Sequence, residues 1–331
     1  MPKNIIVFHG GGGSEHEISN ISSQFLLKRL GPIENINIHT VLIKAPGVWE
    51  WGMHGECFLT CDGKLKASNT EIRADYAIPW IHGTPGETGE IQCLLEMMKV
   101  PYLGSSFEQS SLCFNKVSTK LYLNSRGIKN SNFTYLGSIE EFHKAEEFFH
   151  KSSGIIFVKA SHQGSSVGCY KVESESQLKS SIEKAFELSS YVLCEEFING
   201  RELEVAVYEY EGELHVTAPA EIHCPTGFYD YDQKYNSSSQ TKTSTVAEGL
   251  SKKCIDEISQ MAKQTFELFK LKDHVRVDFF VTDNETVYLG EPNTYPGLTE
   301  ISLFPQMIES SGVGFTRWLT DRIETSIGRL E

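Results

Sequence analysis

The sequence predicts an α/β protein, with an α+β arrangement in its later part, and three observations support this class. Strand-like and helix-like runs alternate through the first hundred residues, which is typical of parallel pairing in a doubly wound sheet. From Gly104 onward, paired strand-like runs separated by turn residues predict hairpins. The chain has 331 residues, 40% of them hydrophobic and 22% charged, which is enough for two or three domains with ordinary cores.

In the first hundred residues, we expect strands at 4–8, 39–43 and 76–80 and helices at 18–30 and 91–98. The strand candidates are short apolar runs. The first helix follows a glycine-rich turn, and the second ends shortly before a proline, as helices usually do. This alternation is the basis for the parallel sheet.

The later part combines hairpins with amphipathic helices. A helix that has Lys116 near its start ends at Arg126-Gly127, a stop signal. Turn residues stand between the members of two predicted hairpins. Further strands are expected at 154–159, 167–172, 191–195, 204–210, 213–217, 275–281 and 286–290, and helices at 175–189 and 251–270. Residues 223–249 show no period, so this long loop is expected to be functional or disordered.

Charge and composition exclude several classes of protein. The net charge of −14 argues against wide binding of nucleic acid or anionic membranes, although a local nucleotide pocket stays compatible with it. No apolar run approaches the roughly 20 residues of a membrane helix. The apolar stretch at the beginning of the sequence is shorter than that of a signal peptide, so we expect a cytosolic protein. Of the eight cysteines only Cys57 and Cys61 lie close together, which favours free thiols over disulfides or structural zinc.

Three hard oxygen ligands lie in or beside the last predicted hairpin. Asp278, Glu291 and Asn293 would come together across it, and carboxylate and amide oxygens are the ligands that magnesium prefers together with phosphate. The Pro296-Gly297 pair that follows would expose a backbone N–H for a developing oxyanion. On local spacing alone, a solvated acidic hairpin explains these residues equally well.

Two glycine-rich loops are candidate ligand sites. The loop after the first strand lacks the ending of a P-loop. Glu15 in this loop suits an ammonium group better than a phosphate. A tight turn without a ligand, with Glu15 in the first turn of the helix, explains the pattern equally well. The loop at 161–168, which includes Ser165 and Ser166, could close over phosphates while Lys159 reaches their charge. An exposed hairpin with a solvated lysine is the competing interpretation.

Two further segments fit a nucleotide site. Glu195-Glu196-Phe197-Ile198 and Glu202 combine a backbone edge, an apolar clamp and a carboxylate, as a purine nucleoside requires, although acidic surface residues can imitate this pattern. Residues 228–235 place aromatic side chains around one lysine and head the loop at 223–249. That loop is expected to form a lid that excludes water.

These residues, in this order, resemble the D-alanine–D-alanine ligase family of the ATP-grasp superfamily over nearly the whole chain. The resemblance implies a three-domain ATP-grasp fold, with a Rossmann-like domain at 1–104, a central domain at 105–195, and a C-terminal domain at 196–331 that carries the metal site and the lid. The motifs that carry it are the residues 11–19, His82-Gly83 with Gly86-Glu87, Asn115-Lys116, Lys159 with Gly164–Gly168, Tyr229–Tyr235, Arg276 with Asp278, and Glu291–Ser302.

Residue roles follow from the resemblance position by position. It implies ATP binding by Lys116, Lys159, Ser165, Ser166, Glu195, Glu196, Phe197, Ile198, Glu202 and, on the lid, Lys234. It implies two magnesium ions, with manganese as an alternative, held by Asp278, Glu291 and Asn293. It implies substrate contacts by Glu15, His82, Arg276, Gly297 and Ser302. It implies catalytic positions at Glu15, Ser165, Tyr235, Arg276 and Gly297, with Glu15, Ser165 and Tyr235 forming one hydrogen-bonded set.

The implied reaction joins two D-alanines through an acyl phosphate, with ADP and phosphate as products, for peptidoglycan precursor synthesis. Tyr235 beside Lys234 favours an amino acid over a hydroxy acid as the second substrate. Departures from the family pattern at Asn115, Ala160 and Pro292 leave a ligase for other amino acids as the alternative. A catalytically silent nucleotide-binding regulator is disfavoured because every phosphate lysine and metal ligand is present. The resemblance also implies a homodimer.

Overall fold

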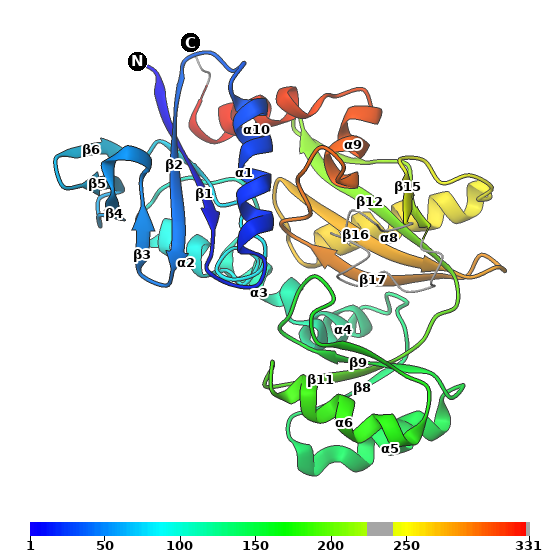
Figure 1. The fold of residues 1–331 in the computed structure, drawn as a ribbon. Coiled ribbons are helices and arrows are strands. Elements are labelled where there is room, and N and C mark those ends of the chain that lie inside the picture. Colours follow the sequence, from blue (N-terminus) through cyan, green and yellow to red (C-terminus); the bar gives the residue numbers. More distant parts are fainter. Residues whose placement is uncertain (224–240, 329–331) are drawn as a thin grey trace.

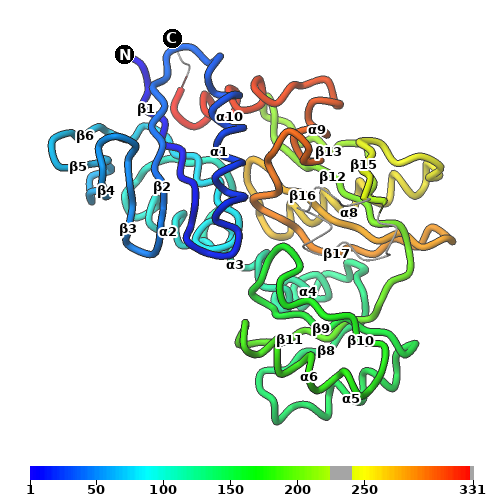
Figure 2. The backbone as a smooth tube through the Cα atoms, viewed as in Figure 1, coloured from blue at the N-terminus to red at the C-terminus, as the bar shows by residue number. Residues whose placement is uncertain are grey.

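The computed structural model describes residues 1–223 and 241–328, and these residues form three β-sheets (Figure 1). The sheets hold seven, four and six strands and follow one another along the chain. Figure 2 shows the part of the chain that carries the first sheet next to the part that carries the third, with the middle part below the third. Each sheet falls within one of the three expected residue ranges, except that β11 of the middle sheet ends one residue beyond its range, and the division of the chain into three domains stays a prediction.

The first sheet has the order β6-β5-β4-β3-β2-β1-β7. Its strands are β1 (Lys3–Gly10), β2 (Ile36–Ala45), β3 (Val48–Glu50), β4 (Glu56–Leu59), β5 (Lys64–Ala67), β6 (Thr70–Arg73) and β7 (Tyr76–Ile78). Its helices are α1 (His16–Leu30), α2 (Glu90–Met97) and the short 3-10 turn η1 (Gly52–His54). The three strands and two helices expected in this region are all present. Each observed end lies within three residues of the expected one.

The parallel sheet expected here is only partly correct. β1 pairs in parallel with β2 and β7, as predicted. From β2 outward, β3 to β6 pair antiparallel in a meander without connecting α-helices, with only the 3-10 turn η1 between β3 and β4. These strands have three or four residues each, with polar side chains and glycine turns, so they lack the longer apolar runs by which buried parallel strands are recognised.

The middle sheet has the order β10-β9-β11-β8 and is antiparallel. Its strands are β8 (Phe133–Leu136), β9 (Ile156–Ala160), β10 (Cys169–Val172) and β11 (Val192–Glu196). Helices α5 (Phe142–Lys151) and α6 (Glu175–Phe186) cover it, with a 3-10 turn η2 (Ile139–Glu141) before α5. The chain reaches this sheet through α3 (Phe107–Phe114) and α4 (Lys116–Ser125), and α4 ends at Arg126 as predicted.

The third sheet follows the order β15-β14-β12-β16-β17, with β13 paired to β12. Its strands are β12 (Arg201–Tyr210), β13 (Glu213–Val216), β14 (Ala220–His223), β15 (Lys242–Ser244), β16 (His274–Val281) and β17 (Val287–Asn293). Its helices are α8 (Lys252–Leu268), α9 (Leu303–Ser310) and α10 (Phe315–Ile327). Both predicted hairpins are antiparallel pairs. In the tighter one, Glu211 and Gly212 have φ of 50° and 79°, which two-residue hairpin turns require.

The first and third sheets share one hydrophobic core. Residues of β1, α1 and β7 pack with residues of β12, α9 and α10, and the rings of Phe25 and Phe315 meet edge to face at 5.4 Å. A second core joins α8 and β16 with Cys113 of α3 and Leu123 of α4. The two helices that lead to the middle sheet are therefore anchored on the third, which brings β9 and β11 to the edge of the β16–β17 hairpin.

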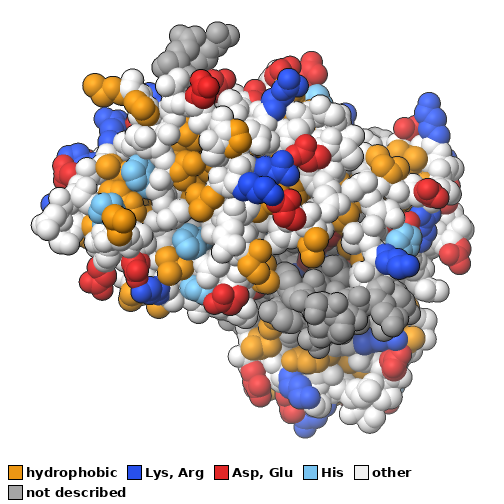
Figure 3. Space-filling view, turned by 45° about the horizontal axis from the view of Figure 1, so that its top comes forward, with side chains coloured by type: hydrophobic (Ala, Val, Ile, Leu, Met, Phe, Trp, Pro, Cys, Tyr) orange, Lys and Arg blue, Asp and Glu red, His pale blue; other side chains and the backbone are white. Residues whose placement is uncertain are grey.

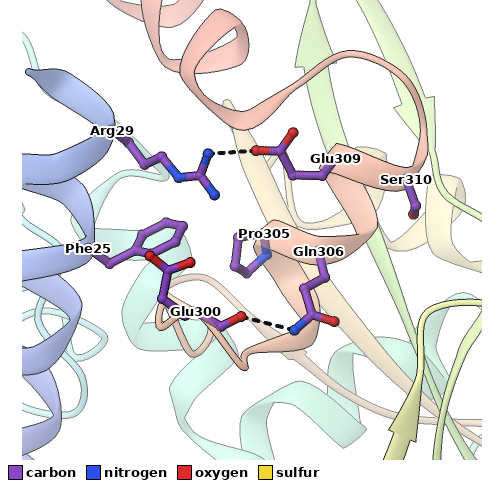
Figure 4. Close-up of a pocket in the computed structure, with 7 residues that line it drawn as sticks. All are labelled: Phe25, Arg29, Glu300, Pro305, Gln306, Glu309 and Ser310. Carbon is purple, nitrogen blue, oxygen red and sulfur yellow. Dashed lines mark hydrogen bonds and ion pairs between the residues drawn. The ribbon is translucent and has the colours of Figure 1, made fainter. Parts of the chain in front are cut away.

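One ion pair also joins α1 and α9 beside a depression of about 390 Å³ (Figure 4). Arg29 Nη1 lies 2.9 Å from Glu309 Oε1, and Figure 4 shows the two side chains reaching across between the helices. Gln306 Nε2 donates to the carbonyl of Glu300 at 3.0 Å. The contact between Gln306 and Glu300 holds the segment before α9 against that helix.

Several composition-based expectations can be compared with the structure. In the part described, no helix combines the length and the apolar character needed to cross a membrane. No disulfide joins any two of the seven cysteines within 1–223 and 241–328, Cys57 and Cys61 included, while Cys224 lies outside these ranges. Figure 3 shows acidic and basic side chains of the described residues interspersed over one face, without a broad basic area there.

Candidate active site

Two cavities meet beside the β16–β17 hairpin. The larger, of about 600 Å³, lies between the start of α1 and the segment at 291–303. The smaller, of about 210 Å³, lies between the middle sheet and the same hairpin. Four residues line both cavities: Lys116, Glu202, Asp278 and Glu291. A group bound in one cavity therefore comes next to a group bound in the other at a junction lined by one cation and three carboxylates.

Glu15 lies buried in the larger cavity, just before α1. Ser165 donates a hydrogen bond from Oγ to Glu15 Oε1 across 150 residues of chain. A Cβ added at Gly83 or at Gly164 would lie 2.7 or 2.9 Å from Glu15 Oε2, so two glycines enclose the carboxylate. The predicted link between Glu15 and Ser165 is present. The third expected partner, Tyr235, lies outside the described residues, as do Lys234 and the rest of 224–240.

His82 lines the same cavity, yet both ring nitrogens contact protein atoms. Nδ1 lies 3.0 Å from the carbonyl oxygen of Tyr295, and Nε2 lies 2.8 Å from Ser22 Oγ. Glu87 Oε1 is 3.8 Å from Nδ1. Burial raises the pKa of Glu87, the charge of Glu15 adds to this rise, and the contact with His82 opposes it. The ring of His82 therefore supports the cavity wall. Glu87 is a second carboxyl group in this cavity, and the sequence analysis named it only as part of a motif, without a role.

Arg276 and the predicted metal ligands form one network. Arg276 donates from Nε to Asp278 Oδ1 and from Nη2 to Asp278 Oδ2, each at 2.7 Å, and its Nε lies 3.2 Å from Glu204 Oε1. Burial alone would lower the pKa of Arg276, but the charges of Asp278 and Glu204 outweigh burial and raise it well above the ordinary value. Asn293 donates from Nδ2 to Asp278 Oδ2 at 3.0 Å. Sequence reasoning did not single out Glu204.

Lys116 connects α4 to the hairpin at the cavity junction. Its Nζ lies 3.0 Å from Glu291 Oε2 and donates to the carbonyl of Gln163 at 2.9 Å. Asn115 caps α4, because its Oδ1 accepts a hydrogen bond from the backbone N–H of Ser118 at 3.1 Å. The asparagine that departs from the family pattern therefore keeps a capping function and leaves Lys116 at the first helical position, facing Glu291.

A buried ion cluster forms one wall of the smaller cavity. Glu195 is paired with Lys159 through Oε1 and with Lys120 through Oε2, the latter at 2.8 Å. Ser131 Oγ donates to the same Oε2 at 2.8 Å. Burial would raise the pKa of Glu195, but the charges of Lys120 and Lys159 outweigh it and hold the pKa well below the usual range. Glu195 thus holds the two lysines in position, and its expected part in ATP binding stays a prediction.

Lys120 was missed by sequence reasoning, although one signal was available. It follows Lys116 by four residues, so both lie on one face of α4. Burial lowers the pKa of Lys120, and the charge of Glu195 offsets part of this shift. Two lysines on one helix face, both beside the smaller cavity, give it a positive wall that suits phosphate groups.

The remaining expected nucleotide residues line the smaller cavity. They are Ser166, Glu196, Phe197, Ile198 and Glu202. Phe197 lies with its ring centroid 5.9 Å from that of Phe157, which provides an apolar wall. Ser166, like its neighbour Ser165, has positive φ, 62° and 48° respectively. Such a backbone costs on the order of 1–3 kcal/mol for each residue and is commonly kept at ligand-binding loops.

Gly297 lies close to Ser302, which ends a turn that begins at Thr299, and both residues line the larger cavity. A Cβ on Gly297 would lie 3.2 Å from Ser302 Oγ, so the two come close. Ser302 Oγ also accepts a hydrogen bond from the backbone N–H of Thr299 at 2.9 Å, just before α9 begins. Both predicted residues therefore face the cavity that holds Glu15 and His82.

The hairpin carries a donor set suited to magnesium. Asp278 and Glu291 supply carboxylates and Asn293 an amide oxygen, all beside the cavity junction, and such hard donors together with phosphate oxygens match the preference of this ion. Within 1–223 and 241–328, no group of three His, Cys, Asp or Glu residues forms a metal site by itself. With two carboxylates and one amide as protein donors, a magnesium ion there would take its remaining ligands from phosphate oxygens or water.

Comparisons with known proteins agree with this arrangement. The chain matches the family models for the D-ala D-ala ligase N-terminus over residues 4–105 and for the D-ala D-ala ligase C-terminus over residues 122–324. It is 43% identical to D-alanine–D-alanine ligase of Aliivibrio fischeri over 98% of this chain and 99% of the relative. Two solved structures are also similar: D-alanyl-alanine synthetase A of Vibrio cholerae (TM-score 0.93, 38% identity, 98% of both chains) and the VanG D-Ala:D-Ser ligase of Enterococcus faecalis (TM-score 0.87, 26% identity, 98% of this chain and 99% of that one).

Proposed function

We propose that this chain, which belongs to the D-alanine–D-alanine ligase family, joins two D-alanines at the expense of ATP, as a step toward a cell-wall peptide precursor. The observation that carries the proposal is the junction at which Lys116, Asp278 and Glu291 line both cavities. An amino acid carboxylate in the larger cavity and the terminal phosphate of ATP in the smaller one would face each other there.

The first step activates a carboxylate. A carboxylate is a poor electrophile, so one of its oxygens forms a bond to the terminal phosphorus of ATP while the bond from that phosphorus to ADP breaks. The product is an acyl phosphate with a good leaving group. Positioning and charge neutralisation provide nearly all of the catalysis in such transfers. Lys116 and Lys159 supply positive charge beside the phosphates, and Glu195 fixes Lys159 in place.

The second step forms the peptide bond. The amine of the second substrate, after loss of a proton, attacks the acyl carbon, and a C–N bond forms. The C–O bond to phosphate then breaks, and inorganic phosphate leaves. Negative charge develops on the carbonyl oxygen between these events. Arg276 and the Gly297 backbone N–H face this cavity, and removing one such donor typically costs 10²–10³ in rate, or about 3–4 kcal/mol.

Substrate placement follows from the charges of the larger cavity. The ammonium of the first D-alanine pairs with Glu15, whose orientation is fixed by Ser165 and by the close approach of Gly164. The carboxylate of the second D-alanine lies near Ser302. His82 acts through the wall that it forms with Tyr295. Lys234 and Tyr235 would complete the site from outside the described residues.

Asp278, Glu291 and Asn293 would hold two magnesium ions, with manganese as an alternative, together with the phosphate oxygens of ATP. Magnesium held there would supply positive charge to the transferred phosphoryl group. The adenosine part occupies the cavity lined by Glu196, Phe197 and Ile198, with Glu202 near the ribose. The carboxylates in this cavity would repel phosphate, and the lysines of its wall together with the metal would offset that repulsion.

Phosphate release with ATP, magnesium and single amino acids of either hand tests the proposal, with the dipeptide identified by mass spectrometry. We expect release with D-alanine and none with L-alanine. Glu15→Gln should raise the KM for D-alanine more than tenfold, since the neutral amide loses the pairing with the ammonium. Glu17→Gln is the matched control, because Glu17 is exposed in the first turn of the same helix. Release with another pair of amino acids would instead identify the alternative, a ligase for different substrates.

The assembly and location expected from the sequence complete the proposal. We infer a homodimer in the cytosol, with ATP and amino acids as the partners of the site. Sedimentation of the purified protein tests the dimer, and a monomer at micromolar concentration would exclude it.

A further inference from the structure

Trp80 joins the first sheet to the segment that carries Gly297. It lies two residues after the end of β7 and is fully buried. Its indole Nε1 donates a hydrogen bond to the carbonyl oxygen of Pro296 at 3.0 Å, across 216 residues of chain. Pro296 and Gly297 share one peptide group, so this hydrogen bond acts on the same planar unit that carries the Gly297 N–H.

The geometry of the peptide group gives this contact a direction. A trans peptide is planar, and its C=O and N–H point to opposite sides. When the indole holds the Pro296 oxygen in the core, the Gly297 N–H points away from the core. Gly297 lines the larger cavity. The hydrogen bond from Trp80 to the Pro296 oxygen therefore sets the orientation of the Gly297 N–H, the proposed oxyanion donor.

The same side chain also contacts the strand that carries Arg276. The indole ring lies flat on His274, with centroids 4.6 Å apart and an interplanar angle of 5°. His274 is the first residue of β16 and precedes Arg276 by two, so both lie in one rigid strand. One side chain is thus in contact with the supports of both proposed oxyanion donors.

We propose that Trp80 is a positioning residue that sets the Gly297 N–H and Arg276 at the separation which the tetrahedral oxyanion requires. This inference rests on the proposed ligase function. Trp80 itself touches no reacting atom. It acts through the Pro296 carbonyl and through His274, and it restricts rotation of the peptide group, which a glycine at 297 would otherwise permit.

Trp80→Phe tests the proposal, with Trp318→Phe as its matched control. Trp318 is equally buried in the same aromatic cluster, contacts His274 at 5.4 Å, and donates from its own Nε1 to the carbonyl of Glu209 at 3.1 Å. The two substitutions remove the same atoms and one comparable hydrogen bond. Only Trp80→Phe releases the Pro296–Gly297 peptide.

We expect Trp80→Phe to lower kcat at least tenfold while the KM for ATP stays within twofold. Trp318→Phe should keep kcat within threefold. Amide hydrogen exchange of a peptide covering 295–298 should become faster in Trp80→Phe and stay unchanged in Trp318→Phe. Trp80→Tyr, which fills more of the space but places no donor at the Nε1 position, serves with the same expectations if Trp80→Phe does not fold.

Equal losses of kcat in the two variants, or unchanged exchange at 295–298 in Trp80→Phe, would overturn the inference. The exchange measurement needs no substrate. If the wild-type protein fails to join D-alanine, the proposed function is wrong, while selective faster exchange at 295–298 still supports the positioning by Trp80. If the wild type is active and the two variants behave alike, only the inference about Trp80 is wrong.

Discussion

The guanidinium of Arg276 and the carboxylate of Asp278 lie side by side on one face of β16, joined by two hydrogen bonds of 2.7 Å. Residues two apart on a strand point to the same face, so the pairing follows from the strand itself. It connects the proposed oxyanion donor with a proposed metal ligand. A metal that draws charge from Asp278 would weaken its hold on Arg276 and leave the guanidinium more available to the substrate.

Arg276→Lys should lower turnover about a hundredfold while ATP affinity changes little. Lysine keeps the charge, but a single ammonium lacks the planar fork that reaches two oxygens at once, so one oxyanion donor is lost. Steady-state turnover and ATP binding measured separately test this. Arg201→Lys is the control, because Arg201 forms a similar forked pair with Glu221 away from Gly297 and Ser302. Loss of ATP affinity with turnover retained at saturation would place Arg276 in the nucleotide site instead.

Glu291→Gln should abolish turnover and leave the thermal midpoint close to that of the wild type. Glu291 is partly exposed at the junction, 3.0 Å from Lys116, so the fold does not depend on its charge. A neutral amide cannot balance the charge of magnesium. Phosphate release over a range of magnesium concentrations is the measurement, with Glu309→Gln, whose partner is Arg29, as the control. Turnover within a few-fold of the wild type would refute the metal assignment.

The parts of the site that were predictable from sequence are those held by local geometry. Asp278, Glu291 and Asn293 belong to one hairpin, and their proximity follows from its turn. The cluster of Lys120, Ser131 and Glu195 joins α4, the segment before β8, and β11. No spacing along the chain predicts such a contact, because it depends on how α4 packs on the third sheet.

Contacts between residues far apart in the sequence that position the site could not be predicted either. The hydrogen bond from Trp80 to Pro296 needs the core shared by the first and third sheets. The antiparallel meander of β3 to β6 was missed because its strands are short and its exposed side chains conceal the alternation that predicts strands. What the resemblance supplied, such as the link between Ser165 and Glu15, concerns a contact between the loop after β1 and the loop between β9 and β10.

Gly164→Ala should raise the KM for the first D-alanine about tenfold without changing the thermal midpoint. The added Cβ would lie 2.9 Å from Glu15 Oε2, so the carboxylate must move away from its place beside Ser165. The Glu15 side chain can yield at its end, so the fold tolerates the change. Gly137→Ala is the control, because its Cβ would meet Tyr191 at an ordinary 3.7 Å. An unchanged KM would show that the enclosure of Glu15 has no part in substrate binding.

His274 should make the fold less stable in mildly acidic solution. Burial among aromatic rings lowers the pKa of His274 to about 3, whereas an unfolded histidine has a pKa of 6.5. Between these values the unfolded chain binds a proton that the folded chain excludes. Stability from this residue is therefore complete above pH 6.5 and declines as the pH falls toward 3, by up to about 1.4 kcal/mol per pH unit.

Urea unfolding at pH 7.5, 6.0 and 5.0, compared between the wild type and His274→Met, measures this contribution. Methionine fills a similar volume and carries no titrating group, so the acidic loss should be smaller in the variant by roughly 2 kcal/mol at pH 5. Carboxylates titrate in the same range in both proteins and cancel in the difference. If the two proteins lose the same free energy between pH 7.5 and 5.0, His274 takes up its proton within the fold, and the aromatic stack with Trp80 must open to water when it does.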